Sequence, residues 1–71
     1  MKQSNIKRLE RAAGMLEKCA DLISDVVFND GDTMTGDNCY WLKQQARDLR
    51  YIVSGITRIA KVAKEDAANE V

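Results

Sequence analysis

Apolar residues recur along the second half of the chain in alternating steps of four and three positions. This spacing keeps one stripe of side chains facing a single neighbour, so it predicts a helix over about 38–64. The stripe, which we call the seam of that helix, consists of Leu42, Ala46, Leu49, Val53, Ile56, Ala60 and Ala63. A heptad pattern of this kind is typical of a helix packed lengthwise on another helix.

The first half of the chain carries a matching seam, which predicts a helix over about 5–28. Its residues are Ile6, Leu9, Ala13, Leu16, Ala20, Ile23 and Val27. A second apolar row lies beside it and consists of Ala12, Met15, Cys19, Leu22 and Val26. At about 100° per residue, the two rows together cover roughly 200° of the helix, about twice what a two-helix hairpin needs. We therefore expect the first helix to face more than one neighbour.

Residues 29–38 separate the two helices and are rich in glycine, aspartate and asparagine, which is typical of a turn. A short connection makes consecutive helices antiparallel neighbours, so we expect an all-α protein with an antiparallel two-helix hairpin. Pairing the two seams in this way gives a constant register in which Leu16 lies opposite Leu49. The EF-hand pattern of ligands and its closing glutamate are missing from the turn, so we expect no calcium there.

The helix ends are less strongly specified than the seams. Ser4 or Asn5 is expected to cap the first helix, because a short side-chain oxygen can accept hydrogen bonds from the free amides of a first turn. Thr33, Thr35 or Asp37 is expected to cap the second helix in the same way. The C-terminal residues Glu65, Asp66 and Glu70 put negative charge at a helix C-terminus, which is unfavourable. We therefore expect residues 65–71 to form a loose tail.

The length of 71 residues allows one domain, and we take residues 1–71 as a single helical-hairpin domain. A core this small usually needs disulfides, a metal or a partner subunit. The predicted register separates Cys19 and Cys39 by about 12 Å along the helices, beyond disulfide reach. The chain has no histidine and no closely spaced cysteine pair, so we expect no metal site.

Association of two copies is the remaining way to enlarge the core. The apolar positions left outside the hairpin seam predict a dimer interface made of Met15, Cys19, Leu22, Val26, Ile52 and Ile59. Large and small layers alternate along both seams, and this layer pattern resembles that of the Rop family of plasmid RNA-binding repressors. The resemblance implies dimerisation of two hairpins into a four-helix bundle. It carries over no individual residues, because the polar residues with which Rop binds RNA have no matching counterparts here.

Charge and composition exclude several classes of function. Eleven basic and eleven acidic residues give no overall attraction to nucleic acid or to an anionic membrane. The commonest general base, histidine, is absent and no catalytic constellation stands out, so we expect neither an enzyme nor a cofactor. No apolar run reaches the roughly 18 residues of a membrane span and no signal peptide opens the chain. We therefore expect a cytoplasmic protein that does not bind membranes.

The charges are distributed unevenly between the two ends of the predicted hairpin. Acidic residues gather near the turn, at Asp21, Asp25, Asp30, Asp32 and Asp37. Basic residues gather at the open end, at Lys2, Lys7, Arg8, Arg11, Arg58, Lys61 and Lys64. An antiparallel dimer that joins acidic to basic ends would account for this distribution, and the basic end is also a possible contact for nucleic acid.

The outward face of the second helix carries two tyrosines and two arginines within a narrow arc: Tyr40, Arg47, Tyr51 and Arg58. Tyrosine and arginine dominate the hot spots of protein interfaces, and they also suit stacking and phosphate contacts with RNA. The alternative is that the tyrosine rings only pack on neighbouring side chains, with their hydroxyls in water. We favour the first interpretation and take these four residues as the predicted partner-binding face.

Together these features predict a small non-enzymatic regulator that acts as a homodimer and binds another protein as an adaptor or inhibitor. Small helical chains of this kind are frequent among phage and plasmid accessory proteins. Two alternatives stay open on the sequence, a Rop-like regulator that binds RNA or DNA and a structural subunit of a larger helical assembly.

Overall fold

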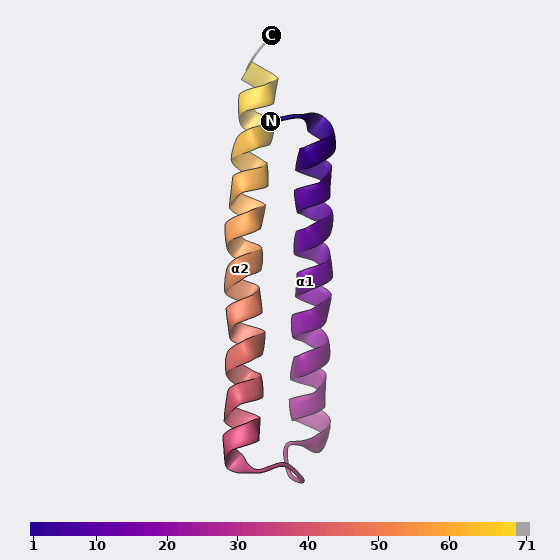
Figure 1. The fold of residues 1–71 in the computed structure, drawn as a ribbon, viewed down its shortest axis with the longest axis vertical. Helices are drawn as coiled ribbons and strands as arrows, with labels where there is room; N and C mark the ends of the chain where they lie inside the picture. Colours follow the sequence, from indigo (N-terminus) through magenta and orange to yellow (C-terminus); the bar gives the residue numbers. More distant parts are fainter. Residues whose placement is uncertain (70–71) are drawn as a thin grey trace.

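The computed structural model describes residues 1–69 and consists of two helices joined by a short connection (Figure 1). Helix α1 covers Gln3–Asp30 and helix α2 covers Gly36–Asn69. The two helices pack against each other in antiparallel orientation, with the start of α1 and the end of α2 on the side opposite the turn. The Cα atoms span 57 × 14 × 12 Å. The expectation of an all-α, antiparallel two-helix hairpin is confirmed.

The turn is closed by backbone groups and by two threonines. The hydroxyl of Thr33 donates a hydrogen bond to the carbonyl of Asp30, at 2.9 Å. At the start of α2, the hydroxyl of Thr35 accepts a hydrogen bond from the amide of Asn38, at 3.1 Å. This contact satisfies one of the amides that a helix start leaves free, so Thr35 is the N-cap among the three predicted candidates.

Both helices extend beyond their predicted limits of about 5–28 and 38–64. Helix α1 begins directly after Lys2, which adopts an extended conformation and makes no side-chain cap hydrogen bond. Ser4 and Asn5 lie inside the helix, so the prediction that one of them caps it is wrong. The carbonyl of Lys2 accepts from the amides of Asn5 and Ile6 and starts the helix without a side-chain cap.

At the other end, α2 includes residues 65–69, most of the segment 65–71 for which we expected a loose tail. Residues 70 and 71 lie outside the described part of the chain. Unfavourable charge at a helix end costs only about 0.3–1 kcal/mol, whereas alanine is the best helix former. Ala67 also continues the seam seven positions after Ala60 and is half-buried. Local propensity and packing therefore outweigh the charge.

The core of the hairpin is thin and consists mainly of alanine. The residues buried along the described chain are Ile6, Ala13, Ala20, Ala46 and Ala60. Apart from Ile6, the larger seam residues are only half-buried: Leu9, Leu16, Ile23, Val27, Leu42, Leu49, Val53 and Ile56. Small side chains let the helices approach closely, but two helices cannot surround a leucine on all sides. The hairpin therefore leaves much of its apolar surface open to further packing.

Candidate interaction surfaces

The seam of the hairpin has two flanks with opposite chemistry. One side of the seam is lined by the residues that directly follow Leu9, Leu16 and Ile23 in α1 and Leu42, Leu49, Ile56 and Ala63 in α2. In α1 these are Glu10, Glu17 and Ser24, and in α2 they are Lys43, Arg50, Thr57 and Lys64. Because equivalent positions of two antiparallel helices face the same side, these residues form a single polar flank.

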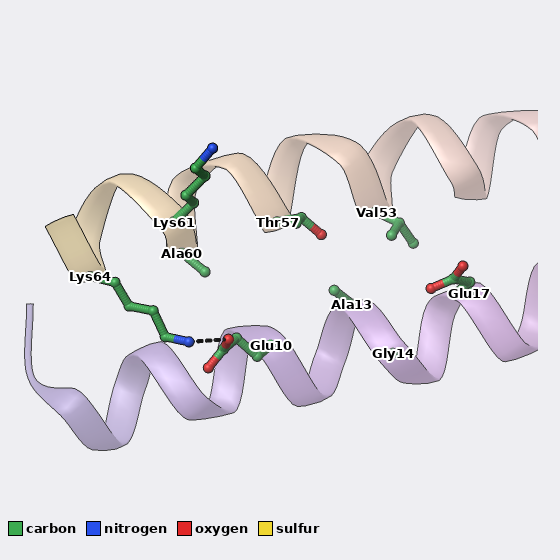
Figure 2. A pocket seen from close by; sticks show the side chains of 9 residues that line it. All are labelled: Glu10, Ala13, Gly14, Glu17, Val53, Thr57, Ala60, Lys61 and Lys64. Atoms are coloured by element: carbon green, nitrogen blue, oxygen red, sulfur yellow. Dashed lines mark hydrogen bonds and ion pairs between the residues drawn. The ribbon is translucent and has the colours of Figure 1, made fainter.

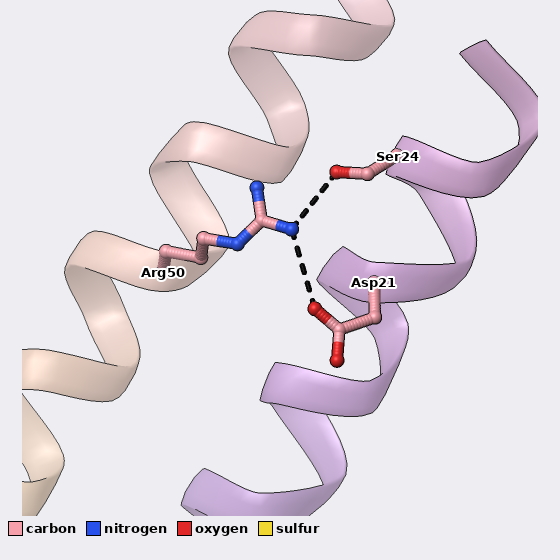
Figure 3. Close-up of polar contacts among 3 residues, drawn as sticks. All are labelled: Asp21, Ser24 and Arg50. Atoms are coloured by element: carbon pink, nitrogen blue, oxygen red, sulfur yellow. Dashed lines mark hydrogen bonds and ion pairs between the residues drawn. The ribbon is translucent and has the colours of Figure 1, made fainter. Parts of the chain in front are cut away.

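Polar contacts between α1 and α2 close this polar flank. Lys64 Nζ donates a hydrogen bond to Glu10 Oε2 at 2.7 Å (Figure 2). Arg50 Nη2 reaches across to α1, where it donates to Asp21 Oδ1 at 3.2 Å and to Ser24 Oγ at 2.9 Å (Figure 3). The paired side chains are 43–63% exposed, and ion pairs that exposed contribute at most about 1 kcal/mol each. The contacts are therefore compatible with the register set by the seams and add little to the stability of the hairpin.

A hollow of ≈ 450 Å³ opens between the two contacts on the polar flank. Figure 2 shows its lining, with Ala13 and Glu17 on α1 facing Val53, Thr57 and Ala60 on α2. The hollow owes its volume to the small side chains at these positions, together with Gly14. The carboxylate of Glu10 at its rim is already engaged by Lys64, so we assign no ligand to it.

The opposite flank is apolar and open. The predicted dimer residues lie there, and all of them are exposed: Met15, Cys19, Leu22, Val26, Ile52 and Ile59. Apart from the small Cys19, they expose 47–65% of their surface. At about 100° per residue, their rows leave the seam on the side away from Glu17 and Arg50. The hairpin therefore brings the predicted interface residues of both helices to one side of the molecule.

Two large residues belong to this apolar flank that the predicted interface did not include. Trp41 is 60% exposed, and Val62 is 48% exposed. Val62 follows Ile59 by three positions, a spacing that keeps both on one helix face. That spacing was the signal available in the sequence. We call the whole surface the apolar flank, defined by Met15, Cys19, Leu22, Val26, Trp41, Ile52, Ile59 and Val62.

The predicted partner-binding face is exposed but divided. Tyr51 and Arg58 border one shallow depression together with Ser54 and Gly55, and Tyr51 is 82% exposed. Tyr40 lies near the turn, where its ring meets that of Trp41 edge-on, with 5.6 Å between the ring centroids. Arg47 lies between Tyr40 and Tyr51 in the sequence and is exposed. Within residues 1–69, neither Arg47 nor Arg58 forms an ion pair. The central unit of this face is therefore Tyr51 with Arg58.

Some of the basic residues at the open end already have partners. Arg8 donates to the side-chain oxygen of Asn5 at 3.1 Å, and Lys64 pairs with Glu10. The remaining cations there have no ion pair in the part of the chain that the structure describes: Lys2, Lys7, Arg11, Arg58 and Lys61.

Within residues 1–69, no three His, Cys, Asp or Glu side chains gather into a group that could hold a metal ion. In the same part of the chain, no helix combines the length and the apolar composition needed to cross a membrane. Cys19 and Cys39 are both free thiols, the first exposed and the second half-buried. Comparisons of the chain with protein-family models, curated proteins and solved structures find no match.

Proposed function

We propose that this chain is a non-enzymatic binding protein that works as a dimer of helical hairpins and engages another protein as an adaptor or inhibitor. The observation that carries the proposal is the apolar flank, where seven large apolar side chains expose 47–65% of their surface along one side of a two-helix unit. Large exposed apolar side chains gathered on one side of a small protein mark an interaction site.

The two surfaces suit two different partners. A second copy that covers the apolar flank completes the thin core with apolar contacts on the open side of the half-buried leucines. The Tyr51–Arg58 depression points away from α1 and stays accessible in such a dimer. Tyrosine and arginine supply large contact area and directed hydrogen bonds, which is why they dominate hot spots. This division of roles supports a dimer that presents a second, more polar surface to another protein.

The test compares two double variants in affinity capture from the native host, followed by binding measurements with the purified partner. Tyr51→Ala with Arg58→Ala removes the central pair, and Glu17→Ala with Lys43→Ala changes two exposed residues of the polar flank as the matched control. We expect the first double variant to weaken partner binding by about thirtyfold or more, because a hot-spot residue is worth about 2 kcal/mol. The control should bind as the wild type does.

If both double variants keep wild-type helicity and dimerisation and bind the partner equally well, the predicted partner-binding face (the Tyr–Arg face) does not bind the partner. Nuclease treatment during the capture separates a protein partner from one held through nucleic acid.

A Rop-like regulator that binds RNA or DNA is the second candidate. The unpaired cations at the open end favour it, because phosphate contacts are made mainly by lysine and arginine. Binding of that kind weakens steeply as salt concentration rises. Retention on nucleic acid at low salt that disappears with increasing salt, and that Lys7→Ala with Arg11→Ala abolishes, would favour this candidate over the first. A structural subunit would instead sediment as an assembly larger than a dimer.

A further inference from the structure

We propose that the second copy covers the apolar flank with its turn at the opposite end, so that α1 of one copy packs antiparallel on α1 of the other around a two-fold axis near Cys19. This arrangement deepens the proposed function and rests on its dimer. It specifies which helices meet and places the two copies of α2 next to each other.

The apolar row of α1 is self-complementary about this axis. A two-fold axis at the level of residues 18 and 19 places Ala12 against the second copy's Val26, and Met15 against the second copy's Leu22. The midpoint of each pair falls at residues 18 and 19, so both pairs can form at once when the two helices run antiparallel. An interface between two identical surfaces requires such a common midpoint. Met15, Leu22 and Val26 are 53%, 65% and 48% exposed in the single hairpin. The pairing therefore covers the side chains that the hairpin leaves open.

The outer edge of the same row carries complementary charge. Arg11, Lys18 and Asp25 follow one another at steps of seven and are all exposed. The antiparallel pairing brings Arg11 next to the second copy's Asp25, and symmetry makes this contact twice. Lys18 lies at the axis and faces the second copy's Lys18. Its long aliphatic stem allows the ammonium group to reach water. The two outer pairs are favourable in this arrangement and surround a single like-charge contact.

The alternative arrangement keeps both turns at one end and packs α1 against the second copy's α2. It would bring together two acidic turn ends, each with Asp21, Asp25, Asp30, Asp32 and Asp37. It would also bring the two basic open ends together, and like charges at close range repel. Turns at opposite ends place each acidic end beside a basic end. The charge distribution therefore favours the arrangement in which α1 meets α1.

A consequence for partner binding follows from the same geometry. Packing α1 on α1 also places the two copies of α2 side by side. Both Tyr51–Arg58 depressions then lie on one broad side of the dimer, related by the two-fold axis. A protein partner would meet two equivalent sites on that side.

Cross-linking through the native cysteines tests the arrangement. Cys39→Ser leaves Cys19 alone near the axis, and Cys19→Ser leaves Cys39 alone near the turn. At a concentration where sedimentation gives a dimer, we expect mild oxidation or a short bifunctional maleimide to link the Cys39→Ser protein covalently. The Cys19→Ser protein should stay uncross-linked, because each Cys39 lies about eight residues, or roughly 12 Å, from the axis on opposite sides of it, which puts the two thiols beyond the reach of a short linker. Linkage through Cys39 and not through Cys19 would overturn the proposal.

A charge exchange tests the α1–α1 contact independently. Arg11→Asp and Asp25→Arg should each raise the dimer dissociation constant by roughly five- to thirtyfold, since each turns two attractive contacts into repulsive ones. The double variant restores both pairs with reversed sign and should return to within about threefold of the wild type. Circular dichroism at the wild-type level shows that the hairpin is intact in all three.

Failure of the double variant to recover would overturn the arrangement while leaving a dimer in place. A wild-type chain that sediments as a monomer up to high micromolar concentration would overturn the arrangement and the dimer together. Loss of partner binding in an intact, cross-linkable dimer is a separate result, which concerns only the Tyr–Arg face.

Discussion

The two flanks of the hairpin border the same seams, yet they differ in their contacts. The side chains of the polar flank pair with each other, and those of the apolar flank remain exposed. On the polar flank, Lys64 pairs with Glu10, and Arg50 bridges Asp21 and Ser24, so α1 and α2 satisfy each other. On the apolar flank, large residues such as Leu22 and Ile59 are more than half exposed. One flank therefore closes the hairpin, and the other is available to a further helix.

This difference explains how a chain of 71 residues can carry so small a core. The polar contacts join the two helices on the exposed flank but contribute little free energy. Apolar burial contributes roughly 25 cal/mol per Å², so the open flank holds most of the stability that association could add. The predictions below separate these roles, starting with the largest expected effect.

The sharpest way to separate the two flanks is to introduce a charge on the apolar flank and to remove one from the polar flank. Leu22→Glu puts a carboxylate in the middle of the apolar flank, and we expect monomers or an unfolded chain, because burying an unpaired charge is very costly. Glu17→Leu is the matched change on the polar flank and should leave the sedimentation coefficient unchanged. Sedimentation equilibrium and circular dichroism report both effects. A Leu22→Glu protein that dimerises as the wild type does would show that the apolar flank is not the interface.

The second prediction concerns the seam between the flanks. Leu16 and Leu49 are half-buried in the hairpin and lie opposite each other in the predicted register. Truncating either to alanine should lower the free energy of unfolding by about 2–5 kcal/mol if a second copy completes their burial. A loss nearer to 1 kcal/mol would indicate that these leucines stay half exposed in solution. Urea unfolding at two protein concentrations distinguishes the two outcomes.

Substitutions at the two glycines inside the helices, Gly14 and Gly55, give a further comparison of the two sides of the hairpin. An added Cβ would meet open space at both Gly14 and Gly55, so neither glycine is required by the hairpin itself. Gly14→Ala, beside the hollow of the polar flank, should stabilise the protein by about 1 kcal/mol. Gly55→Ala should bring the same gain to the helix but weaken partner binding if a helix of the partner approaches the Tyr51–Arg58 depression, which Gly55 borders. Equal partner binding by both variants would show that no partner helix packs against Gly55.

The smallest effect is expected from the ion pairs of the polar flank. Glu10→Gln and Asp21→Asn should each cost between about 0.2 and 1 kcal/mol, because the paired side chains are half exposed and well solvated. The loss should shrink further at high salt, since salt screens exposed charges. Thermal unfolding at low and high ionic strength measures this difference. A loss of several kcal/mol would mean that these pairs are buried by a partner.

Part of the candidate site could be read from spacing alone. Rows such as Met15–Cys19–Leu22 share a helix face at any register, so their common exposure on one flank follows from periodicity. The division of the Tyr–Arg face could not be read in this way. Tyr40 meets Trp41 while Tyr51 shares a depression with Arg58, and these choices depend on side-chain rotamers that the sequence pattern does not fix.

The sequence by itself determined the two helices and their antiparallel pairing, because periodicity and turn chemistry act over a few residues. It narrowed the cap of α2 to three residues, and the hydrogen bond from the amide of Asn38 identified Thr35 among them. Only the tertiary structure decided that alanines rather than leucines are enclosed and that Arg50 bridges Asp21 and Ser24. The tertiary structure also decided that α2 continues past Ala67, because packing there outweighs the unfavourable charge at the helix end. These features depend on how closely two helices approach and on how many neighbours surround each side chain, and no local pattern specifies either.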